Sequence, residues 1–254
     1  MTASHDRRIA RAIELAGTCP EAAPLLEFHC ELTRFQKPIF EEFSKRGETD
    51  VRCLLRYFPD LFRLTKRLGP SALAEFDYRR LEDPAAQEAL LLSQWQGESD
   101  SGLADREPEA FFARVLLQPY AEYLATRGQI DLQRSEPACT FCNARPVASV
   151  LRGEGDGGKR WLVCSLCSTE WPFRRLLCAN CGEVDKEKLP VFTNDLFDYV
   201  RVEACDTCGA YLKSIDCTLN GHAIPAIDEL ATVSLNIWAE SQGYSKVEPN
   251  LLGL

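Results

Sequence analysis

Residues 139–167 read CTFCNARPVASVLRGEGDGGKRWLVCSLC, and residues 178–208 read CANCGEVDKEKLPVFTNDLFDYVRVEACDTC. Each stretch begins and ends with a Cys-x-x-Cys pair, with 21 residues between the pairs in the first stretch and 23 in the second. Only 10 residues separate the two stretches. Their first pairs begin 39 residues apart and their second pairs 41 residues apart, so the region is an internal duplication.

This spacing predicts two metal sites. A Cys-x-x-Cys turn directs two sulfurs at one point, and two such turns supply the four thiolates of a tetrahedral cage. The short central gap groups the pairs two by two. The first site would consist of Cys139, Cys142, Cys164 and Cys167, and the second of Cys178, Cys181, Cys205 and Cys208.

The residue after each turn bears on its geometry. Gly182 and Gly209 follow the last cysteine of their turns, and glycine lets backbone amides approach the thiolates. Asn143 can replace glycine there because asparagine tolerates the left-handed region. Ser168 does so less readily, so we expect the Cys164/Cys167 turn to be the least regular.

Metal ligation also explains how such short modules fold. A module of about 40 residues cannot bury enough apolar surface to be stable alone, whereas a structural metal supplies the missing free energy. Structural disulfides are disfavoured in a chain expected to be cytoplasmic. A thioredoxin-like dithiol would need one pair opening a helix, not four pairs in β-rich surroundings. The other cysteines and the histidines have no metal spacing, and we expect structural or solvated roles for them: Cys19, Cys30, Cys53, Cys217, His5, His29 and His222.

The chain before the duplication reads as helical. Apolar residues recur every three or four positions from Leu25 to Phe43, with a kink or break expected at Pro38. Similar patterns predict helices over 51–62, with a bend at Pro59, and over 85–95 and 111–124. Asp83-Pro84 precedes the helix over 85–95 as a cap and first-turn proline. Residues 96–102 read as a loop and 127–137 as a linker.

Short β-rich segments dominate the duplication, and a helix follows it. Residues 146–151 and 159–163 predict a hairpin, as do 199–203 and 210–215. One helix with Ile227 and Trp238 on the same face should end at Gly243, and the leucines of the tail should dock back on the helical part. The fold class is therefore α+β, with a helical domain at 1–134, metal modules at 135–175 and 176–220, and a C-terminal helix and tail at 221–254.

Composition excludes several functions. The 254 residues carry a formal net charge of −9, and neither half is basic, which disfavours nucleic-acid or anionic membrane partners. No stretch approaches the roughly 18 apolar residues of a membrane helix. The Arg7-Arg8 pair is not followed by an apolar segment, so we reject an export signal and expect a cytoplasmic protein.

No nucleotide-binding, hydrolase-elbow or metalloprotease motif occurs, and a four-thiolate cage has no open coordination position, so we predict a non-enzyme.

The whole chain resembles the FdhE family of formate dehydrogenase accessory (formation) proteins. The resemblance lies in the four tandem cysteine pairs after a helical part, in residues 227–240, IDELATVSLNIWAE, and in residues 247–253, VEPNLLG. It implies a helical domain followed by two tandem rubredoxin-like (zinc-ribbon-like) modules whose ligands are the eight paired cysteines. It also implies two bound metal ions, with iron the metal associated with the family.

The resemblance further implies a function. Family members are cytoplasmic maturation factors that bind the catalytic subunit of respiratory formate dehydrogenases and are needed for its activity. Two alternatives stay open at this point: an electron carrier using Fe(S-Cys)₄ centres, and a zinc-ribbon nucleic-acid adaptor, which the charge disfavours. Sequence alone cannot distinguish iron from zinc, because both accept tetrahedral thiolates.

Overall fold

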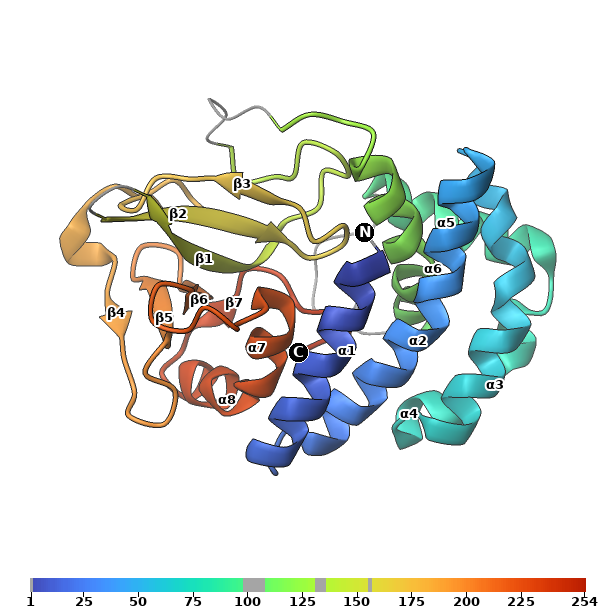
Figure 1. Ribbon diagram of the computed structural model, residues 1–254, viewed down its shortest axis with the longest axis horizontal. Helices are drawn as coiled ribbons and strands as arrows, with labels where there is room; N and C mark the ends of the chain where they lie inside the picture. Colours follow the sequence, from blue (N-terminus) through green and yellow to red (C-terminus); the bar gives the residue numbers. More distant parts are fainter. Residues whose placement is uncertain (1, 98–107, 131–135, 155–156) are drawn as a thin grey trace.

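The computed structural model describes residues 2–97, 108–130, 136–154 and 157–254 (Figure 1). A helical part is followed by a mixed sheet that is covered on one side by C-terminal helices, which confirms the α+β prediction. The helical elements are α1 (Thr2–Thr18), α2 (Ala23–Arg46), η1 (Val51–Tyr57), α3 (Phe58–Leu68), α4 (Ser71–Ala74), η2 (Tyr78–Leu81), α5 (Pro84–Gln96), α6 (Pro108–Ala125), η4 (Lys186–Lys188), α7 (Pro225–Ala231) and α8 (Val233–Ser241). The strands are β1 (Pro146–Glu154), β2 (Gly157–Cys164), β3 (Glu170–Pro172), β4 (Val191–Phe192), β5 (Val200–Cys205), β6 (Ala210–Asp216) and β7 (Ser245–Lys246).

The helical part follows the predicted apolar stripes, with two corrections. Helix α2 continues through Pro38, so the predicted break is absent, and a kink at Pro38 stays a prediction. The segment predicted as one helix over 51–62 is a 3₁₀ turn followed by α3, because Pro59 stands in the first turn of α3, where its missing N–H costs nothing. The predicted cap is present, since the Asp83 carboxylate accepts a hydrogen bond of 3.1 Å from the Ala85 N–H. Most of the predicted 96–102 loop and residues 131–135 of the predicted linker lie outside the described residues.

The first helix, α1, has no counterpart among the predicted elements. Its buried face carries His5, Arg8, Ala12 and Leu15, so charged and polar side chains interrupt the apolar pattern that would reveal it. These residues still recur every three or four positions, and α1 packs along both α2 and α7. Figure 1 shows α1 between the remaining helices and the C-terminal part.

One sheet runs through both cysteine stretches. Its strand order is β3-β2-β1-β6-β5-β4, and β7 adds to β6. The two predicted hairpins are present as the antiparallel pairs β1/β2 and β5/β6. Strands β1 and β6 are parallel, with Ala148 opposite Lys213 and Leu151 opposite Asp216. The duplicated halves are therefore joined edge to edge.

The predicted C-terminal helix is two helices, α7 and α8, divided at Thr232. The Thr232 hydroxyl donates to the carbonyls of Asp228 and Glu229 at 2.9 and 3.1 Å. Lys213 Nζ, from β6, donates to the carbonyls of Glu229 and Thr232. The Asp228 and Glu229 carbonyls accept these side-chain hydrogen bonds, and the Thr232 carbonyl accepts from the Leu235 N–H at 3.0 Å in addition to Lys213. Apolar periodicity cannot report such side-chain contacts.

Buried contacts hold the helical and C-terminal parts together. Arg11 of α1 forms a bidentate ion pair with the buried Asp228 of α7. Its Nη2 donates 2.5 Å to Oδ1 and its Nε donates 3.2 Å to Oδ2. The tail docks as expected, because Leu251 is buried in the main core and Arg114 of α6 donates 3.0 Å to the Pro249 carbonyl. We propose that residues 1–134, 135–175, 176–220 and 221–254 are distinct folding units, although one sheet joins the second and third.

Candidate metal centres and the adjoining cavity

The first predicted quartet converges at one point. The sulfurs of Cys139, Cys142, Cys164 and Cys167 all lie within 4.8 Å of one another. Individual Sγ–Sγ distances are 3.5 Å for Cys139–Cys167, 3.3 Å for Cys142–Cys164 and 3.6 Å for Cys142–Cys167. Two residues come from the turn before β1, and two from the end of β2 and the turn that follows it.

The second quartet repeats this arrangement. Cys178 and Cys181 lie in the turn before η4, and Cys205 and Cys208 join β5 to β6. Their sulfurs also lie within 4.8 Å of one another, at 3.7 Å for both Cys178–Cys208 and Cys181–Cys205. The duplicated sequence thus builds the same sulfur cluster twice.

Both clusters have the dimensions of a metal cage. Four metal–sulfur bonds of about 2.3 Å at tetrahedral angles hold the sulfurs about 3.8 Å apart. A disulfide would bring two sulfurs to about 2.05 Å, and all twelve cysteines are free. The two groups can therefore hold two metal ions that accept soft tetrahedral ligands, among which are iron and zinc.

The turns share one backbone geometry. Asn143, Ser168, Gly182 and Gly209 all have positive φ, at 57°, 55°, 80° and 67°. Asn143 behaves as predicted, but Ser168 adopts the left-handed region as well, so the Cys164/Cys167 turn is more regular than the sequence suggests. The Cys164 N–H donates 2.9 Å to the Thr169 carbonyl, as the Cys139 and Cys178 amides do to Ala144 and Glu183. A non-glycine residue in the left-handed region costs roughly 1–2 kcal/mol in backbone strain. The hydrogen bonds and sulfur positions of the turn offset this cost at Asn143 and Ser168.

Backbone amides point at the sulfurs. Cys164 Sγ accepts from the Leu166 and Cys167 amides at 3.4 and 3.3 Å, and Cys178 Sγ accepts from the Asn180 and Cys181 amides at 3.3 and 3.5 Å. The Asn180 side chain adds a donor 3.4 Å from Cys208 Sγ. Such donors stabilise thiolates and orient them toward a metal.

The two groups differ in their exposure to solvent. In the first group Cys139, Cys164 and Cys167 are buried, and they belong to the same apolar core as the helical part. In the second group Cys181 is exposed and Cys208 is half-buried. A chelator or a redox partner therefore reaches the second group more easily than the first.

The remaining candidates stay outside both groups. Among the described residues no histidine joins a metal-ligand cluster. Cys30 is buried, Cys19, Cys53 and Cys217 are half-buried, and His222 is exposed. His29 is buried, and burial lowers its pKa to about 4, so it is neutral at pH 7.

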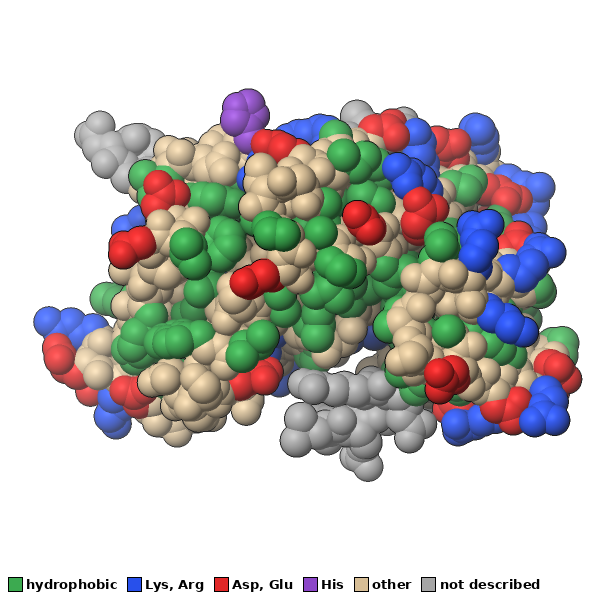
Figure 2. Space-filling model, turned by 90° about the horizontal axis from the view of Figure 1, so that it is seen from below, with side chains coloured by type: hydrophobic (Ala, Val, Ile, Leu, Met, Phe, Trp, Pro, Cys, Tyr) green, Lys and Arg blue, Asp and Glu red, His purple; other side chains and the backbone are tan. Residues whose placement is uncertain are grey.

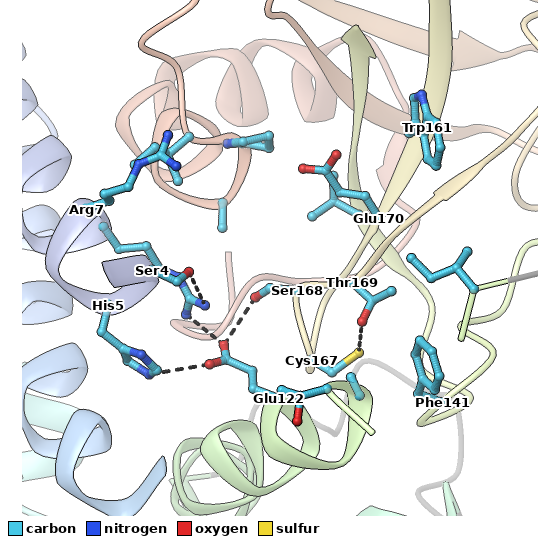
Figure 3. A pocket seen from close by; sticks show the side chains of 18 of the residues that line it. Ser4, His5, Arg7, Glu122, Phe141, Trp161, Cys167, Ser168, Thr169 and Glu170 are labelled. Carbon is cyan, nitrogen blue, oxygen red and sulfur yellow. Dashed lines mark hydrogen bonds and ion pairs between the residues drawn. The ribbon is translucent and has the colours of Figure 1, made fainter. Parts of the chain in front are cut away.

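A cavity of about 690 Å³ adjoins the first group (Figure 3). Glu122 of α6 lies at its base and accepts 2.7 Å from Arg8 Nη1 and 3.4 Å from the Ser168 hydroxyl. His5 Nε2 lies 3.4 Å from the other carboxylate oxygen. Cys167 Sγ lies 3.1 Å from Thr169 Oγ1, so the turn that holds this sulfur also lines the cavity.

The sequence did not predict the polar cluster around Glu122, which includes Arg8 and Ser168. Arg8 and Glu122 are 114 residues apart, and Ser168 is a further 46 residues away. No local spacing links them, unlike the cysteines, whose pairs are three residues apart. The only local signal is the three- and four-residue spacing of His5, Arg8 and Ala12, which gives one face of α1 a polar edge.

Comparisons with known proteins match both cysteine regions. The family descriptions "FdhE, central domain" and "FdhE, C-terminal domain" match residues 138–175 and 176–252, one cysteine group in each. An Aquifex aeolicus protein named "Protein FdhE homolog" is 29% identical over 259 residues, which cover 92% of this chain and 90% of that protein. A Stutzerimonas stutzeri protein of the same name is 32% identical over 204 residues, or 78% of this chain and 65% of the relative.

The similarity extends to the three-dimensional fold, and some relatives match over only part of their length. The crystal structure of the FdhE protein from Pseudomonas aeruginosa superposes with a TM-score of 0.73 over 99% of this chain and 96% of that one, at 22% identity. That likeness shows a shared fold. A Haemophilus influenzae FdhE homolog is 31% identical over 126 residues, and the match spans only 41% of its length.

Proposed function

Because this chain belongs to the FdhE family, we propose that it is a maturation factor for a respiratory formate dehydrogenase. In this proposal it binds the catalytic subunit of that enzyme in the cytoplasm and is needed for the subunit to become active. The observation that carries the proposal is the match of both cysteine domains, which together contain all eight paired cysteines.

The chemistry of the cysteine groups supports a role without turnover. Each group offers four protein sulfurs, so a bound ion has no open position for a substrate. We propose that the eight cysteines hold two metal ions, with iron favoured by the family resemblance and zinc as the alternative. The ions would stabilise the turns around them and so shape a surface for the partner.

One observation favours a second candidate function. Cys181 is exposed, so an ion in the second group would lie close to solvent. If that ion is iron, exposure at one sulfur suits electron exchange with a partner, and the chain would be a rubredoxin-like electron carrier. None of the helices in the described residues has the length and apolar character of a membrane-spanning helix.

The nucleic-acid adaptor is the weakest of the three. The net charge is −9. On the face seen in Figure 2, Lys and Arg side chains are mixed with Asp and Glu at the helical end and do not form a stripe. A protein that neutralises phosphates needs clustered basic side chains.

Deletion and capture test the leading proposal. A strain that lacks this protein should make the formate dehydrogenase catalytic subunit and accumulate it in an inactive form. Tagged protein, purified without oxygen, should capture that subunit and should not oxidise formate by itself. Full enzyme activity in the deletion strain together with no captured complex would remove the maturation function and leave the electron carrier.

A further inference from the structure

We propose that the cavity between α1, α6 and the β2–β3 turn binds a small organic anion. Its carboxylate or phosphate group would pair with Arg7, and its apolar part would lie against Phe141 and Trp161. This inference does not depend on the proposed maturation role, since it rests on the lining of the cavity alone.

The cavity has the size and the walls of a small-molecule site. Its volume of about 690 Å³ falls within the range of roughly 300–1,000 Å³ that is usual for ligand pockets. Phe40, Phe141 and Trp161 supply aromatic surface, and polar groups line the α1 side. Figure 3 places Arg7 on one side of the cavity, with Trp161 and Glu170 on the other. A ligand with a charged end and a flat apolar end matches this division.

The charge of the lining selects an anion. Three arginines and two glutamates line the cavity of this acidic protein. Arg8 pairs with Glu122 at 2.7 Å, and Arg152 pairs with Glu170 through two bonds of 2.6 and 2.5 Å, so both carboxylates are neutralised.

The charge of the third arginine, Arg7, is not balanced by a carboxylate in the described residues. Arg7 is exposed, and within the described part of the chain it has no ion-pair partner. Apart from Cys167, which belongs to the first cysteine group, Arg7 is the charged side chain among the described lining residues without a partner of opposite charge. Arginine presents a planar fork that matches carboxylate and phosphate oxygens.

A buried histidine gives a second, independent indication of a ligand. His5 is 1% exposed and lines the cavity, yet neither ring nitrogen makes a hydrogen bond within the described structure. Nε2 lies 3.4 Å from Glu122 Oε2 without a hydrogen bond between them, and Nδ1 has no hydrogen-bond partner. An unpartnered polar group costs free energy when it is buried. A ligand or its bound water, entering from the cavity, would satisfy it after a small movement of the ring.

The site also touches the first cysteine group. Cys167, Ser168 and Thr169 line the cavity beside side chains of α1 and α6. A bound anion would therefore bridge the helical part and the first cysteine module. Because binding to one arrangement stabilises that arrangement, occupancy of the cavity would slow metal loss from the first group.

Titration of the metal-loaded full chain with benzoate and phenyl phosphate tests the site. Benzamide has the shape of benzoate without its charge, and inorganic phosphate has the charge without the ring. We expect saturable binding, measured by calorimetry and by a change in tryptophan emission that Trp161→Phe removes. Benzamide and inorganic phosphate should bind at least tenfold more weakly than their partners. Preference for benzoate or for phenyl phosphate identifies which anionic group the site takes.

Two matched variants decide where binding occurs. Arg7→Gln should weaken binding of the anionic probe at least tenfold. Arg67→Gln, which removes an exposed charge at the end of α3, should leave it unchanged. Circular dichroism confirms that both variants are folded. The proposal is overturned by no binding of either anion, by equal binding of benzamide and benzoate, or by equal affinity of wild type and Arg7→Gln.

Discussion

Lys213 and Glu229 are both completely buried, and Lys213 Nζ lies 2.9 Å from Glu229 Oε1. This ion pair joins β6 to α7. Lys246 of β7 pairs with the same carboxylate, and the Asn250 side chain of the tail donates 2.9 Å to its second oxygen. Burial alone would raise the pKa of Glu229, but the two lysines outweigh it and hold the pKa at about 2. The ionised Glu229 carboxylate therefore connects α7 to β6, to β7 and to the tail.

Replacing this carboxylate should be costly. Glu229→Gln keeps the size of the side chain but leaves Lys213 buried without its counter-charge, which typically costs about 3–5 kcal/mol. Chemical denaturation of the metal-loaded protein at pH 7 measures the loss. Glu240→Gln, at an exposed position in α8, should change stability by less than about 0.5 kcal/mol. Equal midpoints for the two variants would contradict the ion-pair assignment.

The same pair predicts a pH dependence with a definite sign. Glu229 has a folded pKa of about 2 and an ordinary value of 4.5, so between these values the unfolded chain binds more protons. The stability due to its ionisation, about 3 kcal/mol, is complete above pH 4.5 and is lost as the pH falls toward 2. The difference in unfolding free energy between wild type and Glu229→Gln should therefore shrink between pH 6 and pH 3.5. Metal release in acid affects both proteins alike, and a constant difference would count against the pair.

The two cysteine groups could be predicted from the sequence because the geometry of each Cys-x-x-Cys turn is local. A Cys-x-x-Cys turn fixes two sulfurs within four residues, and the 39- and 41-residue offsets pair the turns. The hairpins and most helices of the helical part follow apolar periodicity in the same way. The parallel β1/β6 pairing has no such signal, because residues such as Ala148 and Lys213 meet only through the whole fold.

The missed features depend on buried polar groups. Helix α1 hides its periodicity because His5 and Arg8 occupy its buried face. At the division between α7 and α8, Lys213 of β6 donates to the carbonyls of Glu229 and Thr232. Apolar patterns report burial of hydrocarbon, whereas these elements are determined by long-range hydrogen bonds to charged side chains.

The left-handed turn at Gly182 gives a prediction about a single methyl group. Gly182 has φ of +80°, Gly221 does not have a positive φ, and a Cβ at either position would meet nothing within 4 Å. Gly182→Ala should therefore cost about 1–2 kcal/mol through backbone strain alone. Gly221→Ala should be neutral or slightly stabilising. Denaturation of both metal-loaded variants tests this, and a loss of equal size in both would show that φ is not the cause.

Metal content and metal loss should distinguish the two cysteine groups. We expect two ions per chain by elemental analysis and release to a chelator in two phases. The exposed Cys181 group should release its ion first, because solvent reaches its sulfurs. Cys178→Ser with Cys181→Ser should abolish the fast phase, and Cys139→Ser with Cys142→Ser the slow one. Release in one phase, or loss of the slow phase in the Cys178/Cys181 variant, would contradict this order.

The last prediction concerns the proposed folding units. Cys178→Ser with Cys181→Ser should remove the second ion and, with it, most of the stability of residues 176–220, because about 40 residues bury too little apolar surface on their own. The helical part keeps buried apolar side chains that include Phe43 and Phe112, in a core that extends to the first cysteine group, and it should survive. Trypsin should then release a resistant fragment that contains the helical part, seen by mass spectrometry. The fragment should end between 127 and 137, or near Arg175 if the first module keeps its ion and stays folded.

Cys217→Ser is the matched control for this digestion, since Cys217 is a half-buried cysteine of the same region outside both groups. It should leave the digestion pattern unchanged. The alternative outcome is uniform digestion of the whole chain in the Cys178/Cys181 double variant. That result would mean that the parallel β1/β6 pairing and the Lys213–Glu229 ion pair couple the metal modules and the helical part into one cooperative unit.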